Sequence, residues 1–252
     1  MQRGEITISQ FLISITLSLL VAFSLFFFIT ISTTKTKVIE LYKVNFTVPV
    51  EKKEVSFYVP AVDQYGNGVS TVLKVEALPG KGRILVNINQ LLFWIDTQQS
   101  IQIAKKVAEE ITKKDLSDVD LIYNIETNAS LIEGPSAGAA ITIATIAALE
   151  NKSINKSVVI TGTINPDGSI GPVGGILPKA KAAKEIGATL FLVPKGQGTQ
   201  VNYIPKKRCE QMGPITFCRI TYKAEKINIS NETGIKVKEI SNIEEAIKYM
   251  LI

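Results

Sequence analysis

The chain combines Ser136 with Lys179 and contains no histidine. A Ser–His–Asp triad is therefore impossible, and a serine nucleophile would need another general base, for which lysine is a known substitute. The usual pKa of a lysine is about 10.4, so its amine is protonated at neutral pH. Because burial among apolar neighbours lowers this pKa and frees a lone pair, a buried Lys179 could accept the serine proton.

The residues around Ser136 favour attack on a carbonyl. Gly134, Pro135 and Ala137 flank it, and a small, alanine-rich helix is predicted over 137–150. The first amides of a helix lack internal partners, so they could receive an oxyanion. An alternative is that Ser136 only caps this helix.

Lys179 follows Gly174-Gly175 and begins a helix predicted over 178–186, with Pro178 in its first turn. The field at a helix N-terminus disfavours a charged lysine and so favours the neutral amine that a base requires. Thr161 ends a strand predicted over 157–164, where its hydroxyl could orient the amine. The alternatives are an ordinary surface lysine and an ordinary strand threonine.

These motifs occur in the order GPSAG, TG, and GG followed by lysine, with Thr161 25 and Lys179 43 positions after Ser136. This order and spacing resembles the proteolytic domain of the Lon proteases. The similarity extends from Val69 to Pro194 and loosely beyond. It implies a Ser–Lys dyad peptidase with Ser136 as nucleophile, Lys179 as general base and Thr161, Gly134, Pro135 and Ala137 in support. It also implies a homo-oligomer, a hexamer in that family.

Two departures from the family pattern qualify the resemblance. Lon proteases carry an ATPase module, whereas these 252 residues contain no G-x-x-x-x-G-K-[ST] loop and leave no room for such a module. The chain is therefore expected to act without ATP. The family usually has Thr-Gly-Glu where this chain has Thr161-Gly162-Thr163, so any role of that glutamate is in doubt.

The remaining pattern predicts an α+β domain of the Lon proteolytic type. Alternating or β-branched residues predict strands, and helical spacing predicts helices whose first member begins at Thr97 or Ser100. The predicted strands are 45–62, 69–78, 83–89, 118–126, 157–164, 188–193 and 217–222, and the helices are 97–114, 137–150, 178–186 and 243–251.

The N-terminus predicts one transmembrane helix. No charged residue occurs from Ile6 to Ile31, about 26 residues, which is long enough to cross a bilayer of about 30 Å. A cleaved secretory signal, which would have a shorter apolar region, and a buried core helix are the alternatives. We therefore expect a membrane anchor at 1–34, a linker at 35–44 and the peptidase domain at 45–252.

The flanking charges do not decide the orientation of the anchor. Cys209 and Cys218, the only cysteines, lie nine positions apart around a Gly-Pro turn, where a disulfide could close a loop, although two reduced cysteines are the alternative. Six Asn-x-Ser/Thr sequons could be glycosylated only on an exported domain, or could occur by chance. Together these features favour an extracytoplasmic domain.

The expected function is hydrolysis of unfolded or flexible polypeptides by a membrane-anchored serine endopeptidase, with no metal or cofactor. Two alternatives are a catalytically silent Lon-like binding or assembly module, and a proteolytic subunit that works with a separate ATPase. The net charge of +5 comes from scattered lysines, and only Lys206-Lys207-Arg208 forms a cluster. No nucleic-acid-binding motif accompanies it, so nucleic acid is not an expected partner.

Overall fold

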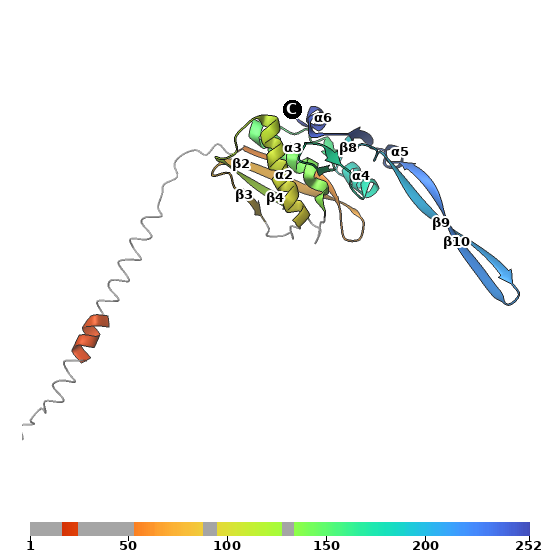
Figure 1. Ribbon diagram of the computed structural model, residues 1–252, viewed down its shortest axis with the longest axis horizontal. Helices are drawn as coiled ribbons and strands as arrows, with labels where there is room; N and C mark the ends of the chain where they lie inside the picture. Colours follow the sequence, from red (N-terminus) through yellow and green to blue (C-terminus); the bar gives the residue numbers. More distant parts are fainter. Residues whose placement is uncertain (1–16, 25–52, 88–94, 128–133) are drawn as a thin grey trace, which may run out of the picture. The chain divides into compact units, whose positions relative to one another are not determined.

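The computed structural model describes residues 17–24, 53–87, 95–127 and 134–252 (Figure 1). The chain divides into two units, Met1–Pro49 and Val50–Ile252. In the first unit, the described residues 17–24 form a helix whose side chains are exposed. Within the described ranges, no helix has both the length and the apolar character that crossing a membrane requires. The rest of the predicted span from Ile6 to Ile31 lies outside the described residues.

The second unit contains a four-stranded sheet in the order β1-β2-β4-β3. Its strands are β1 (Lys53–Val62), β2 (Gly68–Pro79), β3 (Ile84–Asn87) and β4 (Val119–Glu126). β1 and β2, and β2 and β4, are antiparallel, whereas β3 and β4 are parallel. Alternate side chains of β1, Val55, Phe57 and Val59, are buried, as the period of a half-buried strand requires. β1 is an edge strand of this sheet, consistent with Pro60 at its end.

Two helices, α2 and α3, pack against each other and against the turn η1 that carries Ser136. α2 (Ile95–Thr112) buries Ile101, Ala104, Val107 and Ala108 on one face and packs against α3. α3 (Gly138–Glu150) follows a single 3₁₀ turn, η1 (Pro135–Ala137), and its residues 138–149 are all buried. α3 also contacts β1, β2, β5 and α6, so it forms the centre of the main hydrophobic core.

A second, parallel sheet has the order β11-β8-β5. Its strands are β5 (Val158–Ile160), β8 (Leu190–Pro194) and β11 (Lys236–Ile240). Between β5 and β8 the chain forms a small hairpin, β6 (Thr163–Ile164) with β7 (Ile170–Gly171), and helix α4 (Ile176–Glu185). The short helix α5 (Ile229–Thr233) precedes β11, and α6 (Ile243–Met250) follows it. Asn242 caps α6, because its side chain accepts a hydrogen bond from Glu245 N at 2.9 Å.

A long two-stranded hairpin extends from the domain beside α5 (Figure 1). β9 (Thr199–Met212) and β10 (Ile215–Asn228) pair over fourteen residues each, and most of their side chains are exposed. Cys209 and Cys218 are directly opposite in this register and form a disulfide. The structure therefore closes the loop that the cysteine spacing had suggested.

Several predicted elements differ from the observed ones. The strand predicted over 157–164 is wrong as a single strand, because the chain leaves the parallel sheet after Ile160 and pairs with β7 only from Thr163. Neither Thr97 nor Ser100 begins α2, which starts at Ile95, and Ser100 Oγ instead donates to the Asp96 carbonyl at 2.8 Å. The strand predicted over 217–222 is the middle of β10, and its partner β9 was not predicted.

Candidate active site

One open cavity of about 430 Å³ brings together residues from five separate segments of the chain. The end of β1 and the turn after it form one side, η1 and β6 contribute further residues, and the loop before α4 and α4 itself complete it. The lining residues are Val62, Asp63, Gly134, Pro135, Ser136, Thr163, Pro172, Val173, Gly174, Gly175 and Lys179. Ser136 and Lys179, 43 residues apart in sequence, therefore line the same cavity.

Ser136 lies in the 3₁₀ turn η1 immediately before α3. The helix-cap alternative for Ser136 is wrong, because Ala137 occupies the N-cap position of α3 and no side-chain cap hydrogen bond is present. Within the described residues, no hydrogen bond occupies Ser136 Oγ, which leaves the hydroxyl available to a substrate. A Cβ on Gly138 would lie 2.8 Å from the backbone nitrogen of Ile164, so this glycine permits close packing of the turn on β6.

Thr161 and Gly162 fix the 3₁₀ turn η1, which carries Ser136, by hydrogen bonds to its backbone. Gly162 N–H donates to the Ser136 carbonyl at 3.0 Å, and Ala139 N–H donates to the Gly162 carbonyl at 3.0 Å. The Thr161 hydroxyl donates to the same Ser136 carbonyl at 3.2 Å. Since Thr161 N–H is itself bonded to the Leu192 carbonyl at 3.1 Å, the turn that carries Ser136 is fixed to the parallel sheet.

Lys179 is a buried lysine in the first turn of α4, and its N–H donates to the Gly175 carbonyl. Only 3% of its surface is exposed, so the surface-lysine alternative is wrong. Its Nζ donates to Thr161 Oγ1 at 3.4 Å. Burial lowers the pKa of Lys179 from 10.5 to about 8, since the apolar surroundings disfavour the ammonium form. The neutral amine is thus far more abundant near neutral pH than it would be for a lysine with the usual pKa.

Gly175 fixes the entry of the chain into α4. Its φ of +68° lies in the left-handed region, and a Cβ at this position would lie 2.6 Å from Val62 Cγ2. The glycine therefore allows the loop to lie close against the end of β1, which closes the cavity beside Lys179.

Thr161→Val should separate the positioning of Lys179 from its burial. Valine has nearly the shape of threonine but offers no hydroxyl, so Lys179 Nζ loses its acceptor and the Ser136 carbonyl loses one donor. We expect kcat for an unfolded protein substrate to fall about 10- to 100-fold with little change in KM. Because an acceptor stabilises the ammonium form, its loss should also move the ascending, acidic limb of the pH–rate profile to lower pH. Thr161→Ser, which retains the hydroxyl, should preserve both quantities; wild-type kinetics in Thr161→Val would contradict a positioning role.

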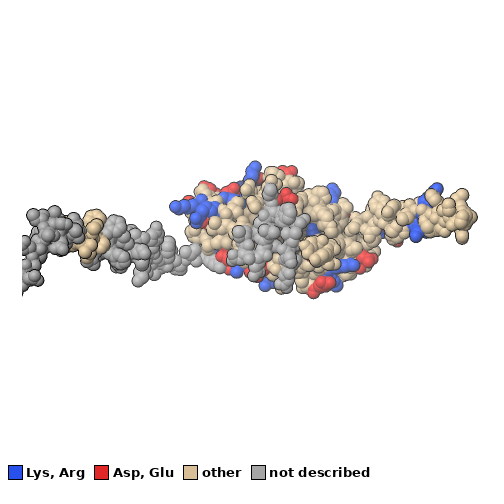
Figure 2. Space-filling view, turned by 90° about the horizontal axis from the view of Figure 1, so that it is seen from below, with Lys and Arg blue, Asp and Glu red and all other residues tan. Residues whose placement is uncertain are grey.

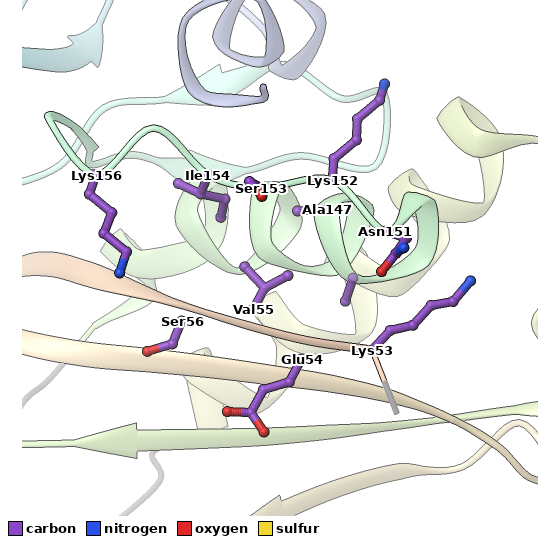
Figure 3. Close-up of a pocket in the computed structure, with 11 residues that line it drawn as sticks. Lys53, Glu54, Val55, Ser56, Ala147, Asn151, Lys152, Ser153, Ile154 and Lys156 are labelled. Atoms are coloured by element: carbon purple, nitrogen blue, oxygen red, sulfur yellow. The ribbon is translucent and has the colours of Figure 1, made fainter. Parts of the chain in front are cut away.

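A second cleft, of about 330 Å³, lies between the start of β1 and the end of α3 (Figure 3). Lysines surround it: Lys156 points toward β1, whereas Lys152 points away and pairs with Glu150 at 2.7 Å. Ser136 and Lys179 are not among its residues. Ser153 in this cleft is exposed and offers a comparison serine for mutagenesis.

The sequence-predicted site residues are distributed unequally around the first cavity. Ser136, Lys179, Gly134 and Pro135 line it, whereas Thr161 lies fully buried behind it. Ala137 does not line the cavity, because its side chain packs against the main core. The other lining residues were not predicted as site residues. Of these, Pro172 and Val173 directly precede the glycine pair and could have been inferred from it, whereas Val62 and Asp63 have no local motif.

Comparisons with known proteins agree with this geometry. A family model described as the Lon protease (S16) C-terminal proteolytic domain matches residues 61–227. An archaeal Lon protease of Thermoplasma volcanium is 37% identical over 89 residues, which are 35% of this chain and 14% of the relative. A Lon protease of Dictyoglomus thermophilum is 28% identical over 169 residues, 63% of this chain and 20% of the relative.

The matched portions cover only a fifth or less of these relatives' own length. The family match nevertheless covers about two thirds of this chain and includes every residue of the cavity. The chain belongs to the Lon protease (S16) proteolytic-domain family, whose members are serine-type peptidases.

Proposed function

We propose that the chain is a serine endopeptidase that uses Ser136 as nucleophile and Lys179 as general base. The observation that carries this proposal is the buried Lys179 amine, whose lowered pKa of about 8 accompanies its position in the same cavity as Ser136. Among the described residues, no carboxylate pairs with Lys179, and a buried lysine without such a partner is costly unless its neutral form is used. Chemistry that requires a neutral amine accounts for this arrangement.

The proposed reaction is acyl transfer. Neutral Lys179 accepts the Ser136 proton as Oγ attacks the scissile carbonyl, and the ammonium then donates that proton to the leaving amine. Water, activated by the neutral amine, hydrolyses the acyl-enzyme and regenerates the serine. The N–H groups of Ser136 and Ala137, at the start of η1, are our candidates for oxyanion donors, because the first amides of a helical turn lack internal acceptors.

The proposed substrates are unfolded or flexible polypeptides, and the proposed hydrolysis is independent of ATP. The 252 residues contain no phosphate-binding loop, and the open cavity offers direct access to an extended segment. Incubation of casein with the full chain in detergent, without nucleotide, would examine both points. Cleavage by the wild type and none by Ser136→Ala is expected. Absence of cleavage by the folded wild type, or cleavage only when an ATPase and ATP are added, would contradict the proposal.

We also propose that the N-terminal segment anchors the peptidase domain on the extracytoplasmic side of a membrane. In the described helix 17–24, Leu17, Leu19, Leu20, Val21 and Phe23 expose more than half of their surface, which is unfavourable in water and favourable in lipid. The Cys209–Cys218 disulfide supports an oxidising compartment and disfavours cooperation with an ATPase in a reducing cytoplasm. Retention in the membrane pellet after alkaline extraction is expected; release by that treatment would argue against the anchor.

A further inference from the structure

The β9–β10 hairpin carries most of the net charge of the molecule. Residues 199–228 include six basic and two acidic side chains, a net charge of +4, whereas the whole chain carries +5. Figure 2 shows basic side chains toward the end of the hairpin on the face that it presents. Because a two-stranded ribbon has no core of its own, these side chains do not contribute to folding by burial. The hairpin therefore presents a net positive surface to the solvent.

The tip of the hairpin is apolar and uncharged. No charged residue occurs from Gln211 to Cys218. Met212 and Ile215 are opposite each other at the turn, and Phe217 lies two residues further along β10 on the same face. These three side chains are 70%, 68% and 58% exposed. Such a cluster is costly in water and marks an interaction site.

Basic residues surround the ribbon directly behind this tip. Arg208 and Arg219 are cross-strand partners on the face that carries Met212, and Lys207 lies on the other face. Glu210, opposite Phe217, lies on the same face between this pair and the tip, so it offsets one of the two arginine charges and leaves a net positive charge behind the tip. Like charges directly opposite each other destabilise a strand pair, so a further anionic group would stabilise the two arginines. With about 3.3 Å per residue, the two arginines lie about 13 Å from the turn. At this distance the apolar tip would reach the acyl region of a bilayer while the basic residues lie at the level of its anionic headgroups.

We propose that the hairpin tip docks on an anionic lipid surface, with Met212, Ile215 and Phe217 inserted and Arg208 and Arg219 at the headgroups. The inference builds on the proposed membrane anchor, which would keep the domain near a bilayer.

A fluorescent probe at the tip can detect this docking in the full chain. The two native cysteines form the disulfide, and the described residues include no free cysteine, so Met212→Cys supplies a thiol for an environment-sensitive dye. The labelled chain is reconstituted into vesicles of phosphatidylcholine alone or of phosphatidylcholine with phosphatidylglycerol. We expect quenching by nitroxide-labelled lipid only in the anionic vesicles, with loss of quenching at high salt.

Charge-neutralised variants provide the matched comparison. Arg208→Gln with Arg219→Gln should shift the equilibrium between docked and free tip about 30-fold toward the free form. Lys236→Gln with Lys238→Gln, two exposed lysines on β11, should leave it unchanged. Equal quenching in both vesicle types, or none in either, would overturn the proposal. Shielding that rises with protein concentration, in neutral lipid as in anionic lipid, would assign the tip to a second copy of the chain and also overturn it.

Failure of the anchor and failure of tip docking give different results. Release by alkaline extraction contradicts the anchor, and the released chain can still be mixed with preformed anionic vesicles to measure the tip probe. An anchored chain with an unquenched probe in anionic vesicles contradicts only the docking of the hairpin. Peptidase activity is independent of both readouts, since no hairpin residue lines the cavity.

Discussion

Replacing Lys179 with methionine should lower kcat for an unfolded protein substrate by about four orders of magnitude or more, the loss that Ser136→Ala should also cause. Methionine fills a similar volume but cannot accept a proton, so Ser136 Oγ would remain a weak nucleophile. The two effects should not add in the double variant, because the residues act in one step. Steady-state hydrolysis of a fluorogenic casein, with folding verified by circular dichroism, measures all three variants.

The matched controls are Lys181→Met, an exposed lysine on α4, and Ser153→Ala in the second cleft. Both should retain wild-type activity.

In the wild type, kcat should rise with pH and level off above about 8, because the neutral amine accumulates as Lys179 loses its proton. At pH 7 about a tenth of the molecules would carry the neutral base. A pH-independent rate between 6 and 9 would show that Lys179 is not the base.

The same Lys179→Met substitution should stabilise the folded domain. A pKa that falls from 10.5 to about 8 on folding corresponds to a destabilisation of roughly 3 kcal/mol wherever the ammonium form is present in both states. Methionine carries no charge to desolvate, so the free energy of unfolding at pH 7 should increase by about 2–3 kcal/mol. Urea denaturation followed by circular dichroism measures this difference.

The wild-type protein should show the corresponding pH dependence. Between pH 8 and 10.5 the unfolded chain binds more protons at this position than the folded one, so the contribution of Lys179 to stability becomes less unfavourable as pH rises. Below pH 8 both states are protonated and the penalty is constant. The difference between Lys179→Met and wild type should therefore shrink as pH rises toward 10.5. An equal gain from Lys181→Met, or a difference that does not vary with pH, would contradict this account.

Elements with a regular period were predictable from the sequence. The strands β2 and β4 and the helices α2, α3 and α6 lie within a few residues of their predicted ranges, because burial on one face or all round imposes a pattern. β1 ends at Val62 as predicted, and residues 45–52 of its predicted range lie outside the described residues. β9 has no such pattern: its residues Pro205 to Arg208 are exposed, so no core constrains them. The break between β5 and β6 was also missed: only Gly162 interrupts the β-branched residues from Val158 to Ile164, and its N–H donates to the Ser136 carbonyl of η1 rather than to a neighbouring strand.

The site residues that belong to sequence motifs were predictable. Ser136, Thr161 and Lys179 were identified because their motifs, in order and spacing, resemble the Lon proteolytic domain. The structure adds the hydrogen bond that joins Thr161 to Lys179 and the burial that lowers the pKa of the lysine. Val62 and Asp63 reach the cavity because the end of β1 meets the loop at Gly175. This approach depends on the packing of distant segments, which no local pattern records.

The attachment of η1 to the parallel sheet has a consequence during synthesis on the ribosome. The serine emerges before the residues that hold its turn, since Gly162 and Thr161 follow it and Thr161 is in turn bonded to Leu192 of β8. A nascent chain that has not yet released β8 contains Ser136 but not the residues that support its turn. On the proposed mechanism, proteolytic competence is acquired late, and a translation product that stops before β8 should be inert toward the polypeptides around it.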